Sequence, residues 1–407
     1  MAYHQNFISQ EELFMFFVGI DVAKSHHDIA IIDDSGQVIL RHIRIMNNRH
    51  GFNKLHQTLI QLSSDTNDDI RIAMEATGHY HLNLISFLQT NSYSAFAYNP
   101  FLIKEFSRTL TLRKTKTDKA DALTIAKKLA TDLAPNRFKP IFNRQELKFL
   151  TRHRNRLTAN RSKIKGQYIR ILDMLFPELA SLLGKANLHN HYVYALLEKY
   201  PSPAKLSRAH TAVLLKLLQN RGNRSDTVHQ LKVTAKQSIG LASPANELEL
   251  IQTITMIRLY DKQIAVIDQK IEQLMSTLNE AAIITSITGI SNRLGSVILS
   301  EINNFNNFNT PDQLLAFAGL EPAIYQSGQV NSNGKMVKRG SASLRWALFQ
   351  AAEYASRWSP IFRQYRQKKI NEGKHYFVAV THVAKKLVRI IFYLIRHHQF
   401  YDESKLL

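Results

Sequence analysis

Four acidic side chains stand at positions from which they could hold metal ions: Asp21, Glu75, Asp118 and Asp121. Asp21 ends the apolar run 16–20, which predicts a short buried strand. Burying an unpaired charge costs so much free energy that such a carboxylate normally pairs, becomes neutral or binds a cation. Asp118 and Asp121 are spaced so that they share one face of a helix.

Carboxylates of this kind can support phosphoryl transfer. Two divalent ions about 3.5 to 4 Å apart stabilise both the attacking and the leaving oxygen during in-line displacement at phosphorus, and hard cations such as Mg²⁺ take oxygen ligands. Singly, each acid has a plainer explanation. Asp118 fits a helix N-terminus, where the dipole favours negative charge, and Glu75 fits a polar strand end. Together the four favour a metal site with a catalytic role.

A serine beside a glycine forms a second candidate site, in the segment 325–328. The hydroxyl of Ser327 can approach a phosphate closely next to Gly328, and a basic stretch, 331–340, follows with a predicted helix over 343–354. Four cations in this region could neutralise a pentavalent transition state: Lys335, Lys338, Arg339 and Arg345. Taken alone, Ser-Gly is also a common turn.

The net charge indicates a polyanionic partner. The 407 residues carry 53 Lys and Arg against 32 Asp and Glu, a formal charge of +21, and 44% hydrophobic content is typical of a globular chain with two or three domains. Nucleic acid is the leading partner, and a basic protein without catalysis, such as a ribosome-associated one, is the alternative. Further candidate contacts are Arg113, Lys114 and Lys116 in a basic loop, and Arg154 and Arg161 on a long helix.

Cysteine and membrane signals are missing from the sequence. Without cysteine there are no disulfides, Cys-based zinc sites or thiol nucleophiles, which fits a reducing cytoplasm. The apolar stretch 13–20 follows two glutamates and runs into Asp21, unlike a signal peptide. No apolar run reaches the roughly 18 residues that a membrane span needs. We therefore expect a cytoplasmic protein that does not contact membranes.

The first third of the chain alternates strands and helices. Three strands over 17–21, 27–32 and 37–45 predict a meander, followed by a helix through Leu55 and Leu59, a strand at 70–75, a helix at 82–88 and a strand at 94–98. An antiparallel meander followed by helix-separated strands is the order of the RNase H fold. A basic loop over 108–116 then leads to Thr117, whose hydroxyl could cap the helix with Asp118 and Asp121.

The rest of the chain is predominantly helical. Heptad-like spacing over 144–176, ended by Pro177, and again over 257–278 predicts two long helices. They could pair as an antiparallel coiled coil or mediate oligomerisation, or they could be ordinary bundle helices. Residues 178–245 are helical in pattern without a readable motif. The segment 283–302, with Gly289 in its turn, resembles a helix-hairpin-helix whose amides meet a phosphate, although a plain helical hairpin explains the same residues.

These blocks together resemble one family, the DEDD-type insertion-sequence transposases related to the Piv DNA invertase, viewed as bridge-RNA-guided recombinases. The resemblance rests on 17–24, 74–78 and 117–122 near the N-terminus, and on 288–290, 317–320, 326–328 and 340–348 near the C-terminus. Ser341 departs from the pattern, because many relatives are expected to carry asparagine after the glycine at this point.

The resemblance implies specific roles. Asp21, Glu75, Asp118 and Asp121 would form a RuvC-like site for Mg²⁺ or Mn²⁺, and Ser327 would attack DNA to give a covalent phosphoserine. It also implies a homo-oligomer, dimer or tetramer, acting on the element ends and target DNA, with the acidic site of one subunit completing the serine site of another. A structured noncoding guide RNA, the bridge RNA, would choose the sequence. Such a protein would work in the bacterial cytoplasm in association with the nucleoid.

The expected architecture has an N-terminal α/β RNase H-like (RuvC-like) DEDD domain over 15–140, a helical or coiled-coil linker over 141–280 and a mostly α-helical transposase domain over 281–400. Residues 1–14 are read as an N-terminal extension before a start at Met15. The expected function is excision and insertion of a bacterial mobile element through RNA-guided strand exchange. A site-specific invertase of the same family, a RuvC-like structure-specific nuclease and a noncatalytic RNA-binding scaffold are the alternatives.

Overall fold

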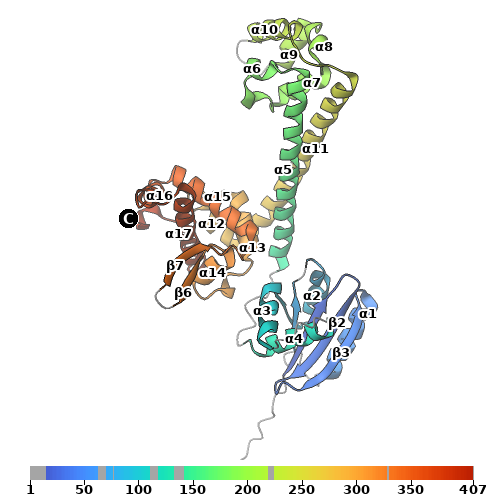
Figure 1. The fold of residues 1–407 in the computed structure, drawn as a ribbon, viewed down its shortest axis with the longest axis vertical. Coiled ribbons are helices and arrows are strands. Elements are labelled where there is room, and N and C mark those ends of the chain that lie inside the picture. The colour runs from blue at the N-terminus through green and yellow to red at the C-terminus, as the bar shows by residue number, and fades with distance from the viewer. Residues whose placement is uncertain are drawn as a thin grey trace, which may run out of the picture. The chain divides into compact units, whose positions relative to one another are not determined.

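The computed structural model describes residues 15–62, 70–76, 78–110, 118–132, 142–218, 224–327 and 330–406, with side chains except at 118–119, 142–143, 224, 322–327, 330–335 and 405–406. The chain divides into two compact units (Figure 1). One comprises residues 1–141 with 304–309, and the other comprises 142–303 with 310–407. The proposed N-terminal extension, the basic loop with Arg113, Lys114 and Lys116, and the cap residue Thr117 lie outside the described residues.

The first unit is built on a five-stranded sheet in the order β3-β2-β1-β4-β5. Its strands are β1 (Phe16–Val22), β2 (His26–Asp33), β3 (Val38–Met46), β4 (Ile70–Glu75) and β5 (Ser94–Tyr98). The first three pair antiparallel, and β4 and β5 extend the sheet in parallel with β1. The predicted meander and the two helix-separated strands are confirmed, and this mixed sheet is compatible with an RNase H-like domain.

Helices cover both faces of the sheet. Leu55 of α1 (Arg49–Leu62) and Leu84 of α2 (His81–Thr90) join one buried cluster with the inward side chains of β1 and β4. Ile103 of α3 (Pro100–Leu110) and Ile125 of α4 (Asp118–Ala130) join a second cluster on the opposite face. The helix α3 was missed: the segment after Pro100 carried no predicted element, and the basic loop was expected to begin at Arg108, which lies in the last turn of α3.

The second unit contains two long antiparallel helices, α5 (Phe142–Leu175) and α11 (Pro244–Ser276), which lie side by side in Figure 1. Three ion pairs join the two helices, and their partners follow one another in opposite directions along α5 and α11, as antiparallel helices require. They are Arg154 with Asp268 (Nη2 to Oδ2, 3.0 Å), Arg161 with Asp261, and Arg170 with Glu249 (2.7 Å). Both predicted helices are confirmed. The second begins earlier than its heptad pattern, because Ser243 caps it and Pro244 occupies the first turn.

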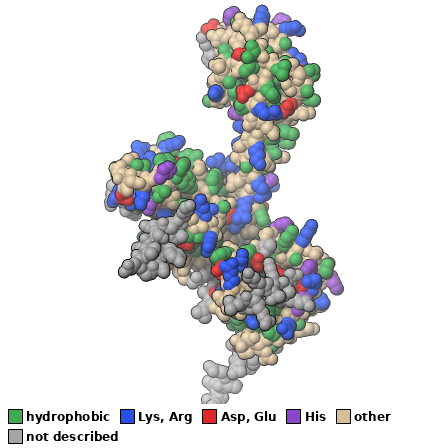
Figure 2. All heavy atoms as spheres, viewed as in Figure 1, with side chains coloured by type: hydrophobic (Ala, Val, Ile, Leu, Met, Phe, Trp, Pro, Cys, Tyr) green, Lys and Arg blue, Asp and Glu red, His purple; other side chains and the backbone are tan. Residues whose placement is uncertain are grey.

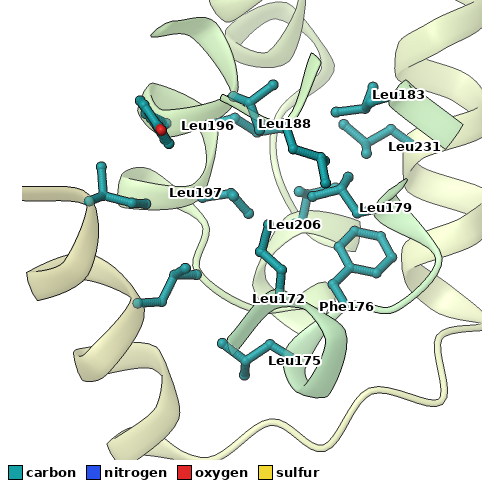
Figure 3. Close-up of a cluster of buried hydrophobic side chains, with 14 of the residues drawn as sticks. Leu172, Leu175, Phe176, Leu179, Leu183, Leu188, Leu196, Leu197, Leu206 and Leu231 are labelled. Carbon is teal, nitrogen blue, oxygen red and sulfur yellow. The ribbon is translucent and has the colours of Figure 1, made fainter. Parts of the chain in front are cut away.

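A compact helical cluster is inserted between α5 and α11. It contains α6 (Leu179–Leu183), α7 (His191–Lys199), α8 (Pro203–Ser207), α9 (Thr211–Leu217) and α10 (Arg224–Lys236). Figure 3 shows its leucine-rich core, to which α5 contributes Leu172 and Leu175 and the inserted helices contribute Leu206 and Leu231. The two ends of the insertion meet, because the Leu241 backbone N–H donates to the Met174 carbonyl at 2.8 Å and an added Cβ at Gly240 would lie 2.0 Å from the Leu175 oxygen.

The C-terminal part of the second unit combines six helices with a β-hairpin. The helices are α12 (Asn279–Thr285), α13 (Asn292–Ile302), α14 (Pro311–Ala318), α15 (Ala342–Trp358), α16 (Pro360–Asn371) and α17 (Tyr376–Arg396), and the hairpin is β6 (Pro322–Ser327) with β7 (Val330–Met336). The hairpin was not predicted as strands. Figure 2 shows Lys and Arg side chains spread over the face in view. None of the helices in the described part of the chain combines the length and apolar character that crossing a bilayer requires.

Candidate active site

Sheet register places Asp21 and Glu75 side by side. β1 and β4 run parallel, and their last registered pair is Ile20 with Met74, so Asp21 and Glu75 follow one step further on neighbouring strands. The inward residues two positions earlier, Gly19 and Ala73, face α4, and side chains two apart on a strand share a face. Adjacent strands lie about 4.8 Å apart. Both half-buried carboxylates therefore leave the same face of the sheet, next to each other.

Helix α4 brings Asp121 to the same edge. Phe17 packs with Ile125 and Leu129, whereas Gly19 lies against Ala122, so α4 runs antiparallel to β1. An added Cβ at Gly19 would lie 2.1 Å from the Ala122 carbonyl oxygen, which shows how closely helix and strand approach. Moving one further step along β1 to Asp21 leads back along α4 toward its N-terminus, where half-buried Asp121 lies. The backbone of Asp118 begins α4 one turn earlier.

Carboxylate oxygens, which hard divalent cations prefer, are present at two adjacent strand ends and in the first turn of the helix packed on them. The Asp118 side chain lies outside the described side chains. Among the residues whose side chains are described, no three His, Asp or Glu groups gather closely enough to hold a metal. Asp21, Glu75 and Asp121 each have an interaction within the protein.

A fifth acid, Asp28, borders this site and was missed by the sequence reasoning. It pairs directly opposite Asp21 in the antiparallel register of β1 and β2, and such pairs place their Cβ atoms about 5 Å apart on one face. Asp28 is only 1% exposed. A signal was present in the sequence, since this aspartate stands directly before the apolar run 29–32 of β2, as Asp21 ends that of β1.

The charge of Asp28 is balanced from the neighbouring strand β3. Arg44 donates to both carboxylate oxygens at 2.9 and 3.1 Å, and His42 Nε2 lies 2.5 Å from Oδ1. Burial opposes ionisation of Asp28, but the hydrogen bonds and charges of Arg44 and His42 outweigh it and lower its pKa. Asp28 is therefore an ionised carboxylate whose partners lie on the side away from Asp21, which limits repulsion between the two acids.

Ser327 is the last residue of β6, in the second unit. Its backbone pairs with Val330 across the hairpin, while Gly328 and the Ser327 side chain lie outside what is described. The hairpin backbone places Ser327 next to the connection between the strands.

The base of the hairpin is fixed by close backbone contacts with the end of α14. The Val337 N–H donates to the Glu321 carbonyl and the Ser341 N–H to the Phe317 carbonyl, both at 3.0 Å. Gly340 is required here, because an added Cβ would lie 2.0 Å from the Phe317 oxygen. The segments 317–320 and 340–348, which carried part of the family resemblance, therefore contact each other.

A buried carboxylate stabilises the base of the hairpin through hydrogen bonds. Glu301 of α13, 1% exposed, accepts hydrogen bonds from Arg152 of α5 at 2.7 and 3.0 Å and from the Ser341 hydroxyl at 2.9 Å. Ser341 also caps α15 by accepting from the Leu344 N–H at 3.2 Å. Burial raises the pKa of Glu301, but its hydrogen bonds and the charges of Arg152 and Lys148 lower it overall. Serine at the position where relatives are expected to carry asparagine thus keeps a polar cap.

The candidate nucleic-acid contacts occupy different surroundings. Arg154 and Arg161 form interhelical ion pairs with Asp268 and Asp261. Arg345 donates to the backbone carbonyls of Ala318 and Lys338 at 3.3 and 3.4 Å, so it holds the hairpin base. Lys338 and Arg339 are exposed beside it, and Arg339 has a further interaction within the protein. The Lys335 side chain lies outside the described side chains.

The helical hairpin around Gly289 uses its glycine for packing. Gly289 has φ +93, and an added Cβ would lie 2.3 Å from the Ala355 backbone nitrogen of α15. The turn between α12 and α13 therefore lies directly against the last turn of α15. Gly289 is therefore required for packing at this turn, and the phosphate contact expected of the hairpin amides stays a prediction.

Comparison with known families and proteins agrees with this arrangement. A DEDD transposase model of the IS110 type matches residues 18–177, and the transposase model of the IS116/IS110/IS902 family matches residues 281–367. A Streptomyces coelicolor protein named as the proposed transposase for the IS117 mini-circle is 25% identical over 97% of both chains. An IS900 insertion-element protein of Mycobacterium paratuberculosis is 26% identical over 95% of this chain and 97% of its own. A pilin gene-inverting protein of Moraxella bovis is 23% identical over 95% and 98%.

Proposed function

The chain belongs to the IS110-type family of DEDD insertion-sequence transposases, and from this premise we propose that it exchanges DNA strands through a four-carboxylate metal site and a serine nucleophile. Enzymes of this class cut and rejoin DNA. The observation that carries the proposal is the alignment of Asp21 and Glu75 on adjacent parallel strands beneath the acidic end of α4. A purely structural role would not require three acids at one sheet edge.

The metal-binding half of the proposal assigns Asp21, Glu75, Asp118 and Asp121 as ligands of Mg²⁺ or Mn²⁺. A bound divalent cation would supply Lewis-acid stabilisation of charge developing on phosphate oxygens. Asp28 is a positioning residue in this scheme. Because Arg44 and His42 neutralise it, it can border the ligands without adding an uncompensated negative charge.

The serine half assigns the covalent step to Ser327. Its hydroxyl oxygen forms a bond to phosphorus while the bond from phosphorus to one deoxyribose oxygen breaks; the serine proton passes to solvent or a nearby base, and the leaving oxygen takes up a proton. A hydroxyl of the exchanged strand then attacks the phosphoserine and restores the serine. The number of phosphodiester bonds is unchanged, so the exchange needs no external energy source. Exposed Lys338 and Arg339 would offset phosphate charge.

Further parts of the proposal concern partners. A guide RNA would pair with the donor and target DNA, so that the protein itself needs to read mainly backbone and shape, a duty that the +21 charge suits. The α5–α11 pair would act as an antiparallel coiled coil in a homo-oligomer, and the protein would act at the nucleoid. Sequencing of RNA that copurifies with the protein, followed by recombination of matching DNA, tests the guided step independently of the chemistry.

Substitution of the proposed nucleophile tests the chemistry. Ser327→Ala should abolish both strand exchange and the covalent protein–DNA adduct that is trapped by denaturation, whereas Ser332→Ala on the paired strand should retain both. Asp21→Asn should also abolish exchange, and Asp34→Asn, at an exposed acid in the turn after β2, serves as its control. A Ser327→Ala protein that still cuts DNA would instead indicate hydrolysis by the acids alone, as in a structure-specific nuclease.

Site-specific inversion is the second candidate function, because two relatives are named pilin gene-inverting proteins and align over 95% of this chain. Inversion and transposition share the same bond exchanges and differ in the arrangement of the DNA ends. A plasmid carrying the element ends in inverted orientation, with and without a separate target, distinguishes the two outcomes by product size.

A further inference from the structure

A cavity in the second unit lies at the turn between α12 and α13. It has a volume of about 400 Å³ and is lined by residues 285–291 of the turn, Arg293 of α13, and Tyr354 and Trp358 of α15. Small-molecule sites span about 300 to 1,000 Å³. The cavity is therefore sized for a single nucleotide, and a double helix would not enter it.

Two aromatic rings of this cavity are exposed. Trp358 is 69% exposed and Tyr354 is 36% exposed, one turn apart on the same side of α15. Neither ring stacks on another aromatic side chain among the described residues. An exposed tryptophan costs hydration free energy unless something covers it, and planar bases stack on such rings.

The charge of the cavity favours an anion. Arg293 is exposed, has no ion-pair partner among the described side chains, and no Asp or Glu is among the residues that line the cavity. The first turn of α13 adds the positive end of a helix dipole at the same rim. An apolar protein partner would gain nothing from this cation, whereas a nucleotide carries both a ring and a phosphate.

The walls of the cavity are held in place before any ligand binds. Gly289 lies against the backbone of Ala355, and the Ser286 hydroxyl donates to the Ile283 carbonyl at 2.6 Å and accepts from the Tyr401 N–H at 2.9 Å. Ser291 accepts from the Leu294 N–H at 3.4 Å and caps α13. A preformed site loses little conformational entropy on binding.

We propose that this cavity captures one unpaired nucleotide of a nucleic-acid strand, with the base against Trp358 and Tyr354 and the phosphate at Arg293. The inference deepens the proposed function, because it names a second contact of the same protein with its polynucleotide. A displaced strand or a looped RNA would supply the unpaired nucleotide, since a base within a duplex is already stacked.

Intrinsic fluorescence provides a direct test, because the chain contains two tryptophans, Trp346 and Trp358. Trp346→Phe leaves Trp358 as the sole reporter, and Trp358→Phe leaves Trp346, which is 42% exposed on the same helix but outside the cavity. With the Ser327→Ala substitution added to prevent reaction, oligothymidylate and oligouridylate should quench Trp358 strongly and Trp346 weakly. An abasic phosphodiester of equal length should leave Trp358 unquenched.

Affinity measurements complete the test. Trp358→Ala should weaken binding of the unpaired oligonucleotide by about tenfold or more, while Trp346→Ala and binding of a blunt duplex should change little; a matching melting profile shows that the variant is folded. Three results would contradict the nucleotide site. They are equal quenching by the abasic strand, no quenching of Trp358, and Trp358 emission that changes with protein concentration alone. Unchanged oligonucleotide binding by Trp358→Ala would reject the nucleotide site. If this variant also still exchanged strands, the proposed function would stand without the inference. Tighter binding of oligothymidylate than of oligouridylate would indicate a DNA strand as the source of the nucleotide, and tighter binding of oligouridylate would indicate an RNA.

Discussion

The acidic edge of the first unit and the serine hairpin of the second are positioned by different kinds of structure. At the acidic edge, strand register and one helix packed on Gly19 determine where Asp21, Glu75 and Asp121 lie. At the hairpin, the position of Ser327 depends on contacts among α14, the segment before α15, and Glu301. The first arrangement follows from regular periodicity, whereas the second depends on residues far apart in the sequence. The position of the acids therefore depends mostly on local sequence, whereas the position of the serine depends mostly on tertiary contacts.

The largest effect should come from the close approach of β1 and α4. Gly19→Ala would place a Cβ 2.1 Å from the Ala122 oxygen, so α4 must move away and the first unit should lose about 3 kcal/mol or more of its free energy of unfolding. The acids on α4 would move with it. Denaturant unfolding followed by probes in each unit measures this change, and an unchanged second unit would confirm that the effect is local.

The same substitution at Gly166 of α5 is a matched control. No atom lies within 4 Å of the Cβ that would be added there, and replacing glycine by alanine inside an exposed helix stabilises it by about 1 kcal/mol. Opposite signs for the two substitutions would show that packing at Gly19, rather than alanine itself, is responsible. Equal effects would remove the argument for the strand–helix contact.

Asp28→Asn should have the next largest effect. The change removes a buried charge that Arg44 and His42 compensate, and we expect a loss of about 2 to 3 kcal/mol from the first unit. Because the positive charge of Arg44 would then lack the Asp28 carboxylate that separates it from Asp21, Mn²⁺ affinity should fall about tenfold, as measured by titration calorimetry. An unchanged Mn²⁺ affinity would limit Asp28 to a stabilising role and separate it from the proposed metal site.

Glu301→Gln should weaken the hairpin base with a defined pH dependence. Its pKa is lowered below the ordinary value of 4.5 in the folded protein, so its stabilisation is complete above that value and is lost as the pH falls through the folded pKa. At neutral pH we expect a loss of about 2 kcal/mol, since Arg152 is partly solvated. The difference between wild type and variant should shrink below pH 4.5; a constant difference would assign the effect to packing.

A smaller loss of stability should come from the ion pairs between α5 and α11. Arg154→Gln breaks a half-buried ion pair with Asp268, and we expect a loss of about 1 kcal/mol with little change in the salt dependence of DNA binding.

Lys338→Gln, at an exposed position, should leave stability unchanged and reduce the salt slope of DNA binding by about one unit. If Arg154→Gln lowered the salt slope of DNA binding and Lys338→Gln did not, Arg154 rather than Lys338 would belong to the nucleic-acid interface.

The strands that carry Asp21 and Glu75 could be predicted from the sequence because strands and helices repeat with fixed periods. The apolar run before Asp21 and the spacing of Asp118 and Asp121 required no knowledge of distant contacts, and the five strands appear where they were expected. Asp28 was missed although it also borders an apolar run, because only the pairing of β1 with β2 places it opposite Asp21.

The surroundings of Ser327 could be predicted only in part. The strands β6 and β7 contain Pro, Gly and several polar residues, so they lack the alternation that reveals a strand. The contact of Gly340 with Phe317 and the link from Glu301 to Ser341 join elements that are separated in sequence. Likewise, Arg154 and Arg161 appeared as free cations in the sequence, and only the antiparallel pairing of α5 with α11 supplies their aspartates.

The helical cluster of α6 to α10 enters and leaves the long helices at a single point, where Leu241 bonds to Met174. Because its two ends already touch, this module can be lengthened, trimmed or exchanged without pulling on either neighbouring helix. A tight turn grafted between positions 175 and 241 would join α5 to α11 directly. The inserted cluster is therefore a site at which another domain, such as a fluorescent protein, could replace it without a change in the sequence around the acids or the serine.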